Sequence, residues 1–267
     1  MRSHLLSQVV LKRFANDAKE VERHDIATDA VTIAATTEVA YRDVETDLIK
    51  DLEQEWSRDI ENNGTKALNA LENGDLLHHS DHVLTVKHLI GLHYIRSAIF
   101  VMTDRQSDQY RTRVIESTAA EYPEHRAEIE ATANSQWPHW EQSVAVKTLQ
   151  DYLPKIQTYI ETHGLEVCVA PDGAEFILGD IPVVTSDGDG RFGVFQGVSL
   201  TDARACAMPL TPHHLVALKT NQTTDRYHRL TAGQVTAAND KERMLAIEAY
   251  YKQPANPPTA GRKVSNE

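Results

Sequence analysis

The spacing of apolar residues changes at Gly164, and this change constrains the fold more than any other feature of the sequence. Before Gly164, apolar residues recur at steps of three and four, the period of a helix that buries one face. After it, short apolar runs are bounded by turn formers such as Pro171-Asp172-Gly173, a pattern typical of strands. The sequence therefore predicts an α+β chain, with a mostly helical N-terminal bundle, a C-terminal antiparallel β meander and a final packed helix.

The helical part is expected at about residues 36–164. The predicted segments are a helix from Tyr41 to Ile60, a break at Asn62-Asn63-Gly64, a short helix from Thr65 to Leu71, an apolar helix capped by Ser80, and a long amphipathic helix opened by Pro138 and ended at Gly164. Residues 114–135 are charged and rich in Ala, with a break at Pro123. They predict one or two solvated helices.

The β-rich part is expected at about residues 165–220. Its strands are predicted at 165–170, 174–178, 182–185, 192–195, 205–208 and 215–218, with a hairpin between the first two. A closing helix at 234–251 completes a single domain of residues 1–252, and the tail at 253–267 is expected to be disordered. Residues 16–35 hold enough β-branched positions for one or two further short strands.

Charge and cysteine content narrow the function classes. The chain has 39 Asp and Glu against 27 Lys and Arg, a formal charge of −12. This charge repels polyanions, so non-specific nucleic-acid binding is not expected. Two cysteines, Cys168 and Cys206, are too few for a secreted disulfide framework, which favours a reduced, cytoplasmic setting. The most apolar segment, Leu89 to Met102, is shorter than the roughly 20 residues that span a bilayer, and the N-terminus lacks a signal-peptide pattern. We expect a soluble protein with no membrane partner.

Five histidines fall close together at positions 78, 79, 82, 88 and 93. His78 and His82 stand four residues apart, a spacing that suits two ligands of one zinc ion, although the intervening Glu of the metalloprotease motif is missing. Solvated or helix-terminal histidines are the alternative interpretation, and the sequence leaves metal and cofactor requirements open. Asp187 to Gly190 resembles the start of a calcium loop, but lacks its bidentate Glu and predicts a turn.

Several polar residues fall on faces that are predicted to point inward. Glu45 lies near the centre of the apolar stripe of the first long helix, with Glu53 and Glu55 on its flanks. A carboxylate that faces a core must be paired or protonated. Arg96, in the most apolar helix, is a candidate partner, because a guanidinium can hold a carboxylate with two hydrogen bonds. Asn239 shares an inward face with Val235. The set forms either a structural network or the floor of a cleft.

The segment His4-Leu-Leu-Ser-Gln-Val-Val-Leu-Lys-Arg-Phe14 resembles the signature His-Tyr-x-Pro-x-x-x-Leu-x-x-Phe of a widespread bacterial family of uncharacterised domains. Tyr94 to Ser97, Phe176 to Val183, Met208 to Pro212 and the Asn239 helix are similar to later parts of that family and keep its order. The segment from Phe176 to Val183 stands where the family has Phe-x-Thr-Ser-Asp-Asn-Pro-Val. Leu5, Ser7, Gly179 and Ile181 replace the Tyr, Pro, Ser and Asn of the family patterns.

The resemblance implies a fold and a site but no activity. It marks His4, a Glu (45, 53 or 55, here taken as Glu53), Arg96, Asp180 and Asn239 as residues that converge. An imidazole and a carboxylate can exchange protons, while a guanidinium can hold an anion. Structural alternatives stand beside these roles, because Asp180 precedes x-Pro and can close an Asx turn. His4 can equally dock the N-terminal segment onto the sheet.

Two function hypotheses follow. The first is a hydrolase or nuclease-type enzyme that acts on an anionic substrate, of the kind found among bacterial defence or toxin proteins, with the catalytic set named above. The second is a non-catalytic binding or regulatory protein in which the same residues form a buried structural network. The sequence leaves open whether the protein is an enzyme, and it specifies neither the substrate nor the oligomeric state.

Overall fold

The computed structural model describes residues 2–43, 58–101, 107–193, 198–200, 202–220 and 222–255, and among these leaves the side chains of 2–4, 41–43, 108 and 142 undescribed. Its centre is a five-stranded sheet of order β10-β5-β9-β8-β7. The strands are β5 (Gly164–Val169), β7 (Val184–Ser186), β8 (Ala205–Thr211), β9 (His214–Lys219) and β10 (Arg226–Arg229). Neighbours pair antiparallel except β10, which runs parallel to β5.

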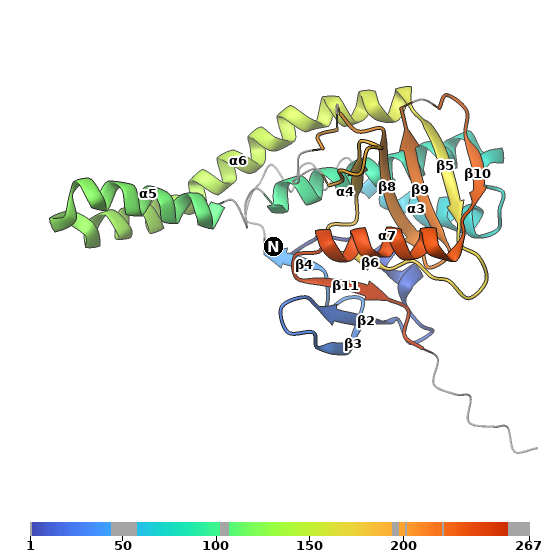
Figure 1. The fold of residues 1–267 in the computed structure, drawn as a ribbon, viewed down its shortest axis with the longest axis horizontal. Helices are drawn as coiled ribbons and strands as arrows, with labels where there is room; N and C mark the ends of the chain where they lie inside the picture. Colours follow the sequence, from blue (N-terminus) through green and yellow to red (C-terminus); the bar gives the residue numbers. More distant parts are fainter. Residues whose placement is uncertain are drawn as a thin grey trace, which may run out of the picture.

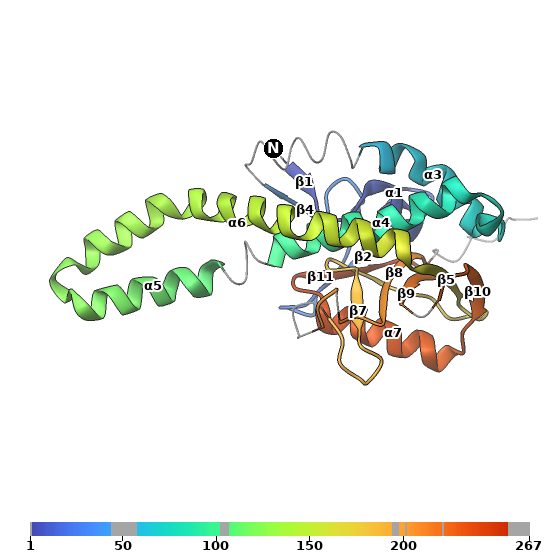
Figure 2. The ribbon, with the colours of Figure 1, turned by 90° about the horizontal axis from the view of Figure 1, so that it is seen from above.

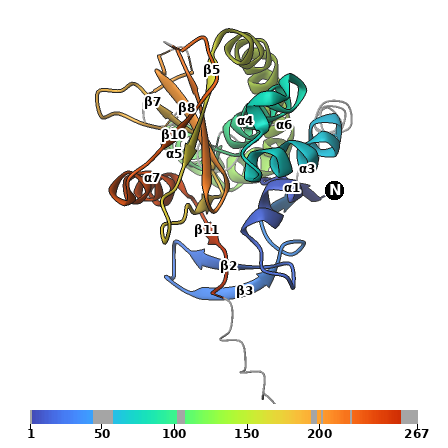
Figure 3. The ribbon, with the colours of Figure 1, turned by 90° about the vertical axis from the view of Figure 1, so that its right-hand side faces the viewer.

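Helices cover both faces of this sheet (Figure 3). Because side chains alternate along a strand, Leu215 and Ala217 of β9 pack with Val235 of helix α7 (Ala232–Leu245). The intervening Val216 and Leu218 join the main core, to which α4 (Ser80–Val101) and α6 (Arg126–Thr162) also contribute. The sheet therefore carries two hydrophobic cores, one on each face.

A second, four-stranded sheet joins the two ends of the described chain. Its order is β3-β2-β11-β6, with β2 at Glu20–Asp25, β3 at Val31–Ala35, β6 at Leu178–Gly179 and β11 at Ala249–Lys252, all antiparallel. A separate pair, β1 (Arg2–His4) and β4 (Tyr41–Asp43), flanks the short helices α1 (Gln8–Leu11) and η1 (Lys12–Phe14). Figure 1 shows β2, β3 and β11 below α7.

Helix α4 is the central helix of the helical layer. Every residue from Leu89 to Val101 is buried, because α4 packs against α6, against α3 (Arg58–Glu72) and on β8. The turn η3 (Leu76–His78) joins α3 to α4. None of the described helices is long and apolar enough to cross a membrane.

A helical arm projects from the body. Helix α5 (Ser107–Glu121), the turn η5 (Pro123–His125) and the first half of α6 form an antiparallel hairpin that extends well beyond the sheets (Figure 1, Figure 2). Helix α6 has 37 residues, which corresponds to a length of about 55 Å at 1.5 Å per residue. The second half of α6 packs on α4, so one continuous helix anchors the arm.

The α+β class is confirmed, but the predicted topology is only partly right. Strands β2 and β3 confirm the short strands expected at 16–35. The sheet after Gly164 is not a purely antiparallel meander, since β10 is parallel to β5. Residues 174–178 do not form a hairpin with β5, because Leu178 belongs to β6 of the other sheet. Phe192 makes a single bridge to Ser186, and residues 194–195 lie outside the described residues.

Several predicted helix ends are also wrong. Helix α3 runs without a break through Gly64, whose missing side chain leaves room for Val9, only 3.1 Å from where a Cβ would stand. Helix α6 begins at Arg126 and passes through Pro138 and Pro154, both on its exposed side. The closing helix ends at Leu245, because the chain turns extended at Ala246 and continues as β11.

Of the helix predicted from Tyr41 to Ile60, residues 41–43 are strand β4, residues 58–60 belong to α3, and residues 44–57 lie outside the described residues. Residues 256–267 of the predicted disordered tail lie outside them too. The single domain over residues 1–252 stays a prediction.

Candidate functional site

Ser7 ties the N-terminal segment to the buried face of α4. Its main-chain N–H donates to Nε2 of His93 at 3.0 Å, and its hydroxyl accepts from Nη1 of Arg96 at 2.9 Å. The other ring nitrogen of His93, Nδ1, lies 2.8 Å from the carbonyl oxygen of Leu89, four residues earlier in the helix. These partners assign the proton to Nδ1, so that His93 is a neutral imidazole with both nitrogens engaged.

The pKa of His93 is lowered to about 3, mainly by burial and also by the nearby charge of Arg96. At neutral pH this histidine therefore carries no charge, and its acceptor nitrogen is occupied by Ser7. The geometry suits a structural tie between two segments, not proton transfer to a ligand.

Arg96 also reaches a carboxylate, although not one that the sequence predicted. Nη1 lies 3.2 Å from Oε1 of Glu61 in α3; the Arg96 side chain is 7% exposed and that of Glu61 is 32% exposed. The pair thus touches solvent through Glu61. The expected partners Glu45, Glu53 and Glu55 lie outside the described residues. Sequence reasoning missed Glu61 because the first helix was expected to end at Ile60.

Asp180 serves the main chain of a distant segment. Its Oδ1 accepts from the N–H of Ile247 at 2.8 Å, and its Oδ2 accepts from Glu248 at 2.7 Å and Ala249 at 3.1 Å. Burial raises its pKa despite these three hydrogen bonds, which act in the opposite direction. These N–H groups belong to Ala249, the first residue of β11, and to the two residues before it, so the predicted local Asx turn is not what the carboxylate closes.

Asn239 plays a similar part on α7. Its Oδ1 accepts from the N–H of Ile177 at 3.0 Å, and its Nδ2 donates to the carbonyl of Glu175 at 2.8 Å. The amide thus satisfies main-chain groups of residues 175 and 177 that a neighbouring strand would otherwise bond. The prediction that Asn239 points inward is confirmed.

Glu242, one turn after Asn239, was missed by sequence reasoning. It is buried, and its Oε2 accepts from the N–H of Gly179 at 3.0 Å. Its Oε1 has no partner among the described residues. Burial raises its pKa well above the usual value, and the charge of Asp180 adds to this effect. Gly179 permits the approach, since a Cβ there would lie 2.9 Å from Oε2.

An apolar cluster lies between the Ser7–Arg96 contact and the Asp180 carboxylate. Phe100 and Val101 at the end of α4 pack with Ile181, and Leu5 and Ile247 lie against them. The N-terminal segment and the segment that follows Asp180 therefore both pack against the C-terminal end of α4. The convergence of the predicted site residues stays a prediction. The main chain of His4 lies in β1 opposite Tyr41, and its side chain is outside the described side chains. Glu53 lies outside the described residues.

The histidine-rich stretch is dispersed by the fold. His93 faces the core, while the rings of His79 and His82 lie 5.0 Å apart at the start of α4. Across the part of the chain that the structure describes, no group of three His, Cys, Asp or Glu side chains is placed to hold a metal ion. Asp187 to Gly190 is the predicted turn, in which Oδ1 of Asp187 accepts from the N–H groups of Asp189 and Arg191.

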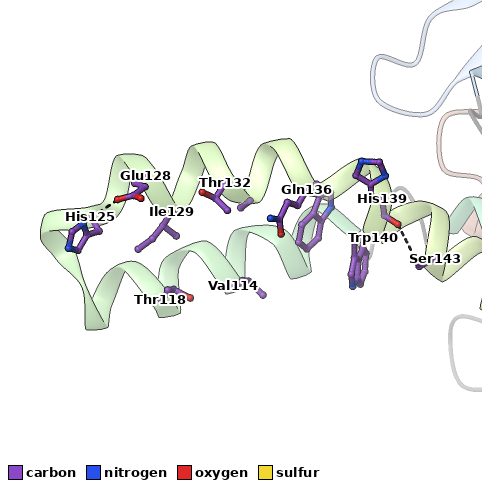
Figure 4. Close-up of a pocket in the computed structure, with 12 residues that line it drawn as sticks. Val114, Thr118, His125, Glu128, Ile129, Thr132, Gln136, His139, Trp140 and Ser143 are labelled. Atoms are coloured by element: carbon purple, nitrogen blue, oxygen red, sulfur yellow. Dashed lines mark hydrogen bonds and ion pairs between the residues drawn. The ribbon is translucent and has the colours of Figure 1, made fainter.

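An open groove with a largely apolar lining lies on the helical arm (Figure 4). The groove has a volume of about 840 Å³, and its lining includes Val114 and Thr118 of α5 and Ile129, Trp137 and Trp140 of α6. The rings of Trp137 and Trp140 stack at 4.7 Å. The indole N–H of Trp137 donates to the hydroxyl of Ser107 at 2.6 Å, which fixes this ring at the base of the arm.

Comparisons with known proteins agree with the resemblance of the N-terminal signature. A family model described as "Protein of unknown function (DUF4238)" matches residues 2–252, nearly the whole chain. No curated protein and no solved structure matches the chain significantly. The chain therefore belongs to the DUF4238 family, whose function is unknown.

Proposed function

We propose that this protein is a non-catalytic binding protein, and that the groove on the α5–α6 arm receives a cationic amphipathic helix of a partner protein. The observation that carries the proposal is the open groove of about 840 Å³, with Trp137 and Trp140 in its wall, on an arm that extends away from the body (Figure 4).

Two antiparallel helices cannot bury their shared face by themselves. In the arm, Ile129 and Val114 remain partly exposed. The exposed ring of Tyr110 stacks on that of Trp140, with 5.3 Å between the ring centroids. Helical bundles reach a closed core with three or four helices. An apolar helix face laid between α5 and α6 would cover the aromatic rings, in the way that other amphipathic helices dock into grooves.

The charge of the arm favours a cationic partner. Residues 109–141 hold six Glu and three Arg, with neither Lys nor Asp: Glu116, Glu121, Glu124, Glu128, Glu130, Glu141, Arg111, Arg113 and Arg126. A helix with Lys or Arg on its polar face would meet these carboxylates at the rim of the groove. A second copy of the arm would bring the same negative charge, which opposes self-association.

The test uses the full chain and a designed helical peptide with Leu on one face and Lys on the other. Binding should shift the tryptophan emission to the blue, because two of the three tryptophans line the groove. Ile129→Glu should abolish the shift, while Met244→Glu, on exposed α7, should leave it unchanged. Absence of a shift at low salt, or a dimer that Ile129→Glu dissociates, would overturn the proposal.

A hydrolase or nuclease-type activity on an anionic substrate is the second candidate. The observation in its favour is that the buried guanidinium of Arg96 reaches the surface through Glu61. If Arg96 binds a substrate anion, Arg96→Lys should remove hydrolysis of a phosphodiester probe and leave the melting temperature within a few degrees. Loss of stability by about 3 to 5 kcal/mol in Arg96→Ala without a separable activity would support the architectural role.

A further inference from the structure

A third surface, remote from the arm, has the features of a small-molecule site. It is a cavity of about 490 Å³ whose lining includes Arg204, Lys219, Gln222 and Arg226, together with hydroxyl side chains such as Ser186 and Thr224. This volume falls in the range of small-ligand pockets. Three cations gather there although the whole chain has a formal charge of −12.

Strand register brings these residues together. Ser186 at the end of β7 pairs with Ala205 at the start of β8, and Ala205 pairs with Lys219 at the end of β9. Lys219 in turn pairs with Gly164, the first residue of β5. One end of the five-stranded sheet thus presents its terminal residues in a row, and Arg226 opens β10 beside them.

A buried carboxylate holds two of the cations in place. Glu166 is 2% exposed, and it accepts from Nζ of Lys219 and, at 2.7 Å, from Nε of Arg226. Burial would raise the pKa of Glu166, but these two partners lower it, so the carboxylate is charged at neutral pH. The negative charge of Glu166 offsets one of the two positive charges of Lys219 and Arg226. The residues described in the cavity wall itself include no carboxylate.

The third cation and a buried amide complete the wall. Gly188 has φ of +82°, a conformation that favours glycine, and Cδ of Arg204 lies 3.0 Å from where its Cβ would stand. The exposed guanidinium of Arg204 lies 3.6 Å from the carboxylate of Asp189. Gln222 is 9% exposed. Its Nε2 donates to the carbonyl of Leu165 at 3.2 Å, whereas its Oε1 is buried with no donor among the described residues.

We propose that this cavity binds a small phosphomonoester that carries a hydroxyl group, with the phosphate on Arg204, Lys219 and Arg226 and the hydroxyl donating to Oε1 of Gln222. Guanidinium and ammonium groups are the common ligands of phosphate oxygens. An acceptor that is buried with no donor among the described residues favours a ligand that brings one, because a desolvated oxygen without a hydrogen bond costs free energy. The cavity is independent of the arm and of its proposed partner.

The test is titration calorimetry on the full chain with glucose 6-phosphate, ribose 5-phosphate, glucose and inorganic phosphate as probes. At least one sugar phosphate should bind, and glucose should not. Arg204→Gln should weaken that binding at least about tenfold. The matched control is Arg191→Gln in the same loop, which is exposed, pairs with Asp187 and does not line the cavity.

Gln222→Leu tests the hydroxyl contact. It should remove the preference for the sugar phosphate over inorganic phosphate while the cations still bind the anion. Three results would overturn the proposal: no heat with either sugar phosphate at about 10 mM, well above millimolar dissociation constants; equal affinity of the wild type for inorganic phosphate and the sugar phosphates; or the same loss of binding in Arg191→Gln as in Arg204→Gln. Circular dichroism of each variant confirms that it is folded.

Discussion

Ser7 accepts a hydrogen bond from Arg96 at 2.9 Å, so the segment that resembles the family's N-terminal signature is tied directly to the central helix. Ser7→Ala should lower the free energy of unfolding by about 1 to 3 kcal/mol, because it leaves a buried guanidinium hydrogen without this acceptor. Urea titration measures the change. Ser117→Ala, on the exposed face of α5, is the control and should stay within about 0.5 kcal/mol of the wild type.

The same position allows a second test, since proline stands there in the family pattern. Ser7 has φ of −57°, which proline adopts without strain. Ser7→Pro would nevertheless remove both the hydroxyl and the N–H that donates to His93. We expect it to be less stable than Ser7→Ala, as measured by urea titration. Equal stability of the two variants would show that the N–H contributes nothing.

His93 makes stability depend on pH in the acid range. Its pKa falls from an ordinary 6.5 to about 3 in the folded protein, mainly through burial. Between these values the unfolded chain binds a proton that the folded chain does not, so stability falls as the pH drops below about 6.5. The slope from this group alone is at most about 1.4 kcal/mol per pH unit.

His93→Gln should make the free energy of unfolding depend less steeply on pH below about 6.5, whatever the substitution costs at neutral pH. Urea titrations at several pH values between about 4 and 7 measure the slope. Ser117→Ala, which removes no titratable group from the exposed face of α5, is the control and should leave the slope unchanged. An unaltered slope in His93→Gln would contradict the assignment.

Glu242 acts in the opposite direction. Its pKa is raised in the folded state, so at a pH above its ordinary value of 4.5 the unfolded chain loses a proton that the folded chain retains. The stability that Glu242 contributes is fully present below pH 4.5 and decreases as the pH rises above that value. Glu242→Gln keeps an oxygen for Gly179 and cannot ionise. Its stability should exceed that of the wild type by a margin that grows as the pH rises above 4.5.

Asp180→Ala tests the architectural role of that residue. It removes the acceptor of three main-chain N–H groups at 247–249, which we expect to cost about 3 kcal/mol or more. Asp180→Asn, which keeps an acceptor oxygen, should cost less. Calorimetric unfolding measures both. A fully stable Asp180→Ala variant would contradict the role described above.

The sequence predicts best where the pattern is local. The apolar run in α4 predicts its burial, and the turn formers after Gly164 place β8 and β9 to within a few residues. The order of the short signatures identifies the family correctly. Asn239 was correctly placed on an inward face, because helical period alone decides that.

The missed features depend on partners far apart in the chain. Nothing near Asp180 signals that it binds residues 247–249, and the pairing of β10 with β5 follows from the tertiary fold. The cavity at Gln222 arises from the register of separate strands, which single-sequence patterns do not fix. Gly64 looks like a helix breaker, yet its lack of a side chain is what allows Val9 to pack there.

In the second sheet, Ala249 pairs with Asp25. On the ribosome, β2 and β3 emerge long before β11, so one edge of β2 has no strand partner until residues 249–252 have been translated. Open strand edges recruit other chains, and nascent polypeptides that expose them depend on chaperones. Synthesis of this protein thus includes a long interval in which β2 and β3 await β11, and slowing translation should increase the aggregated fraction.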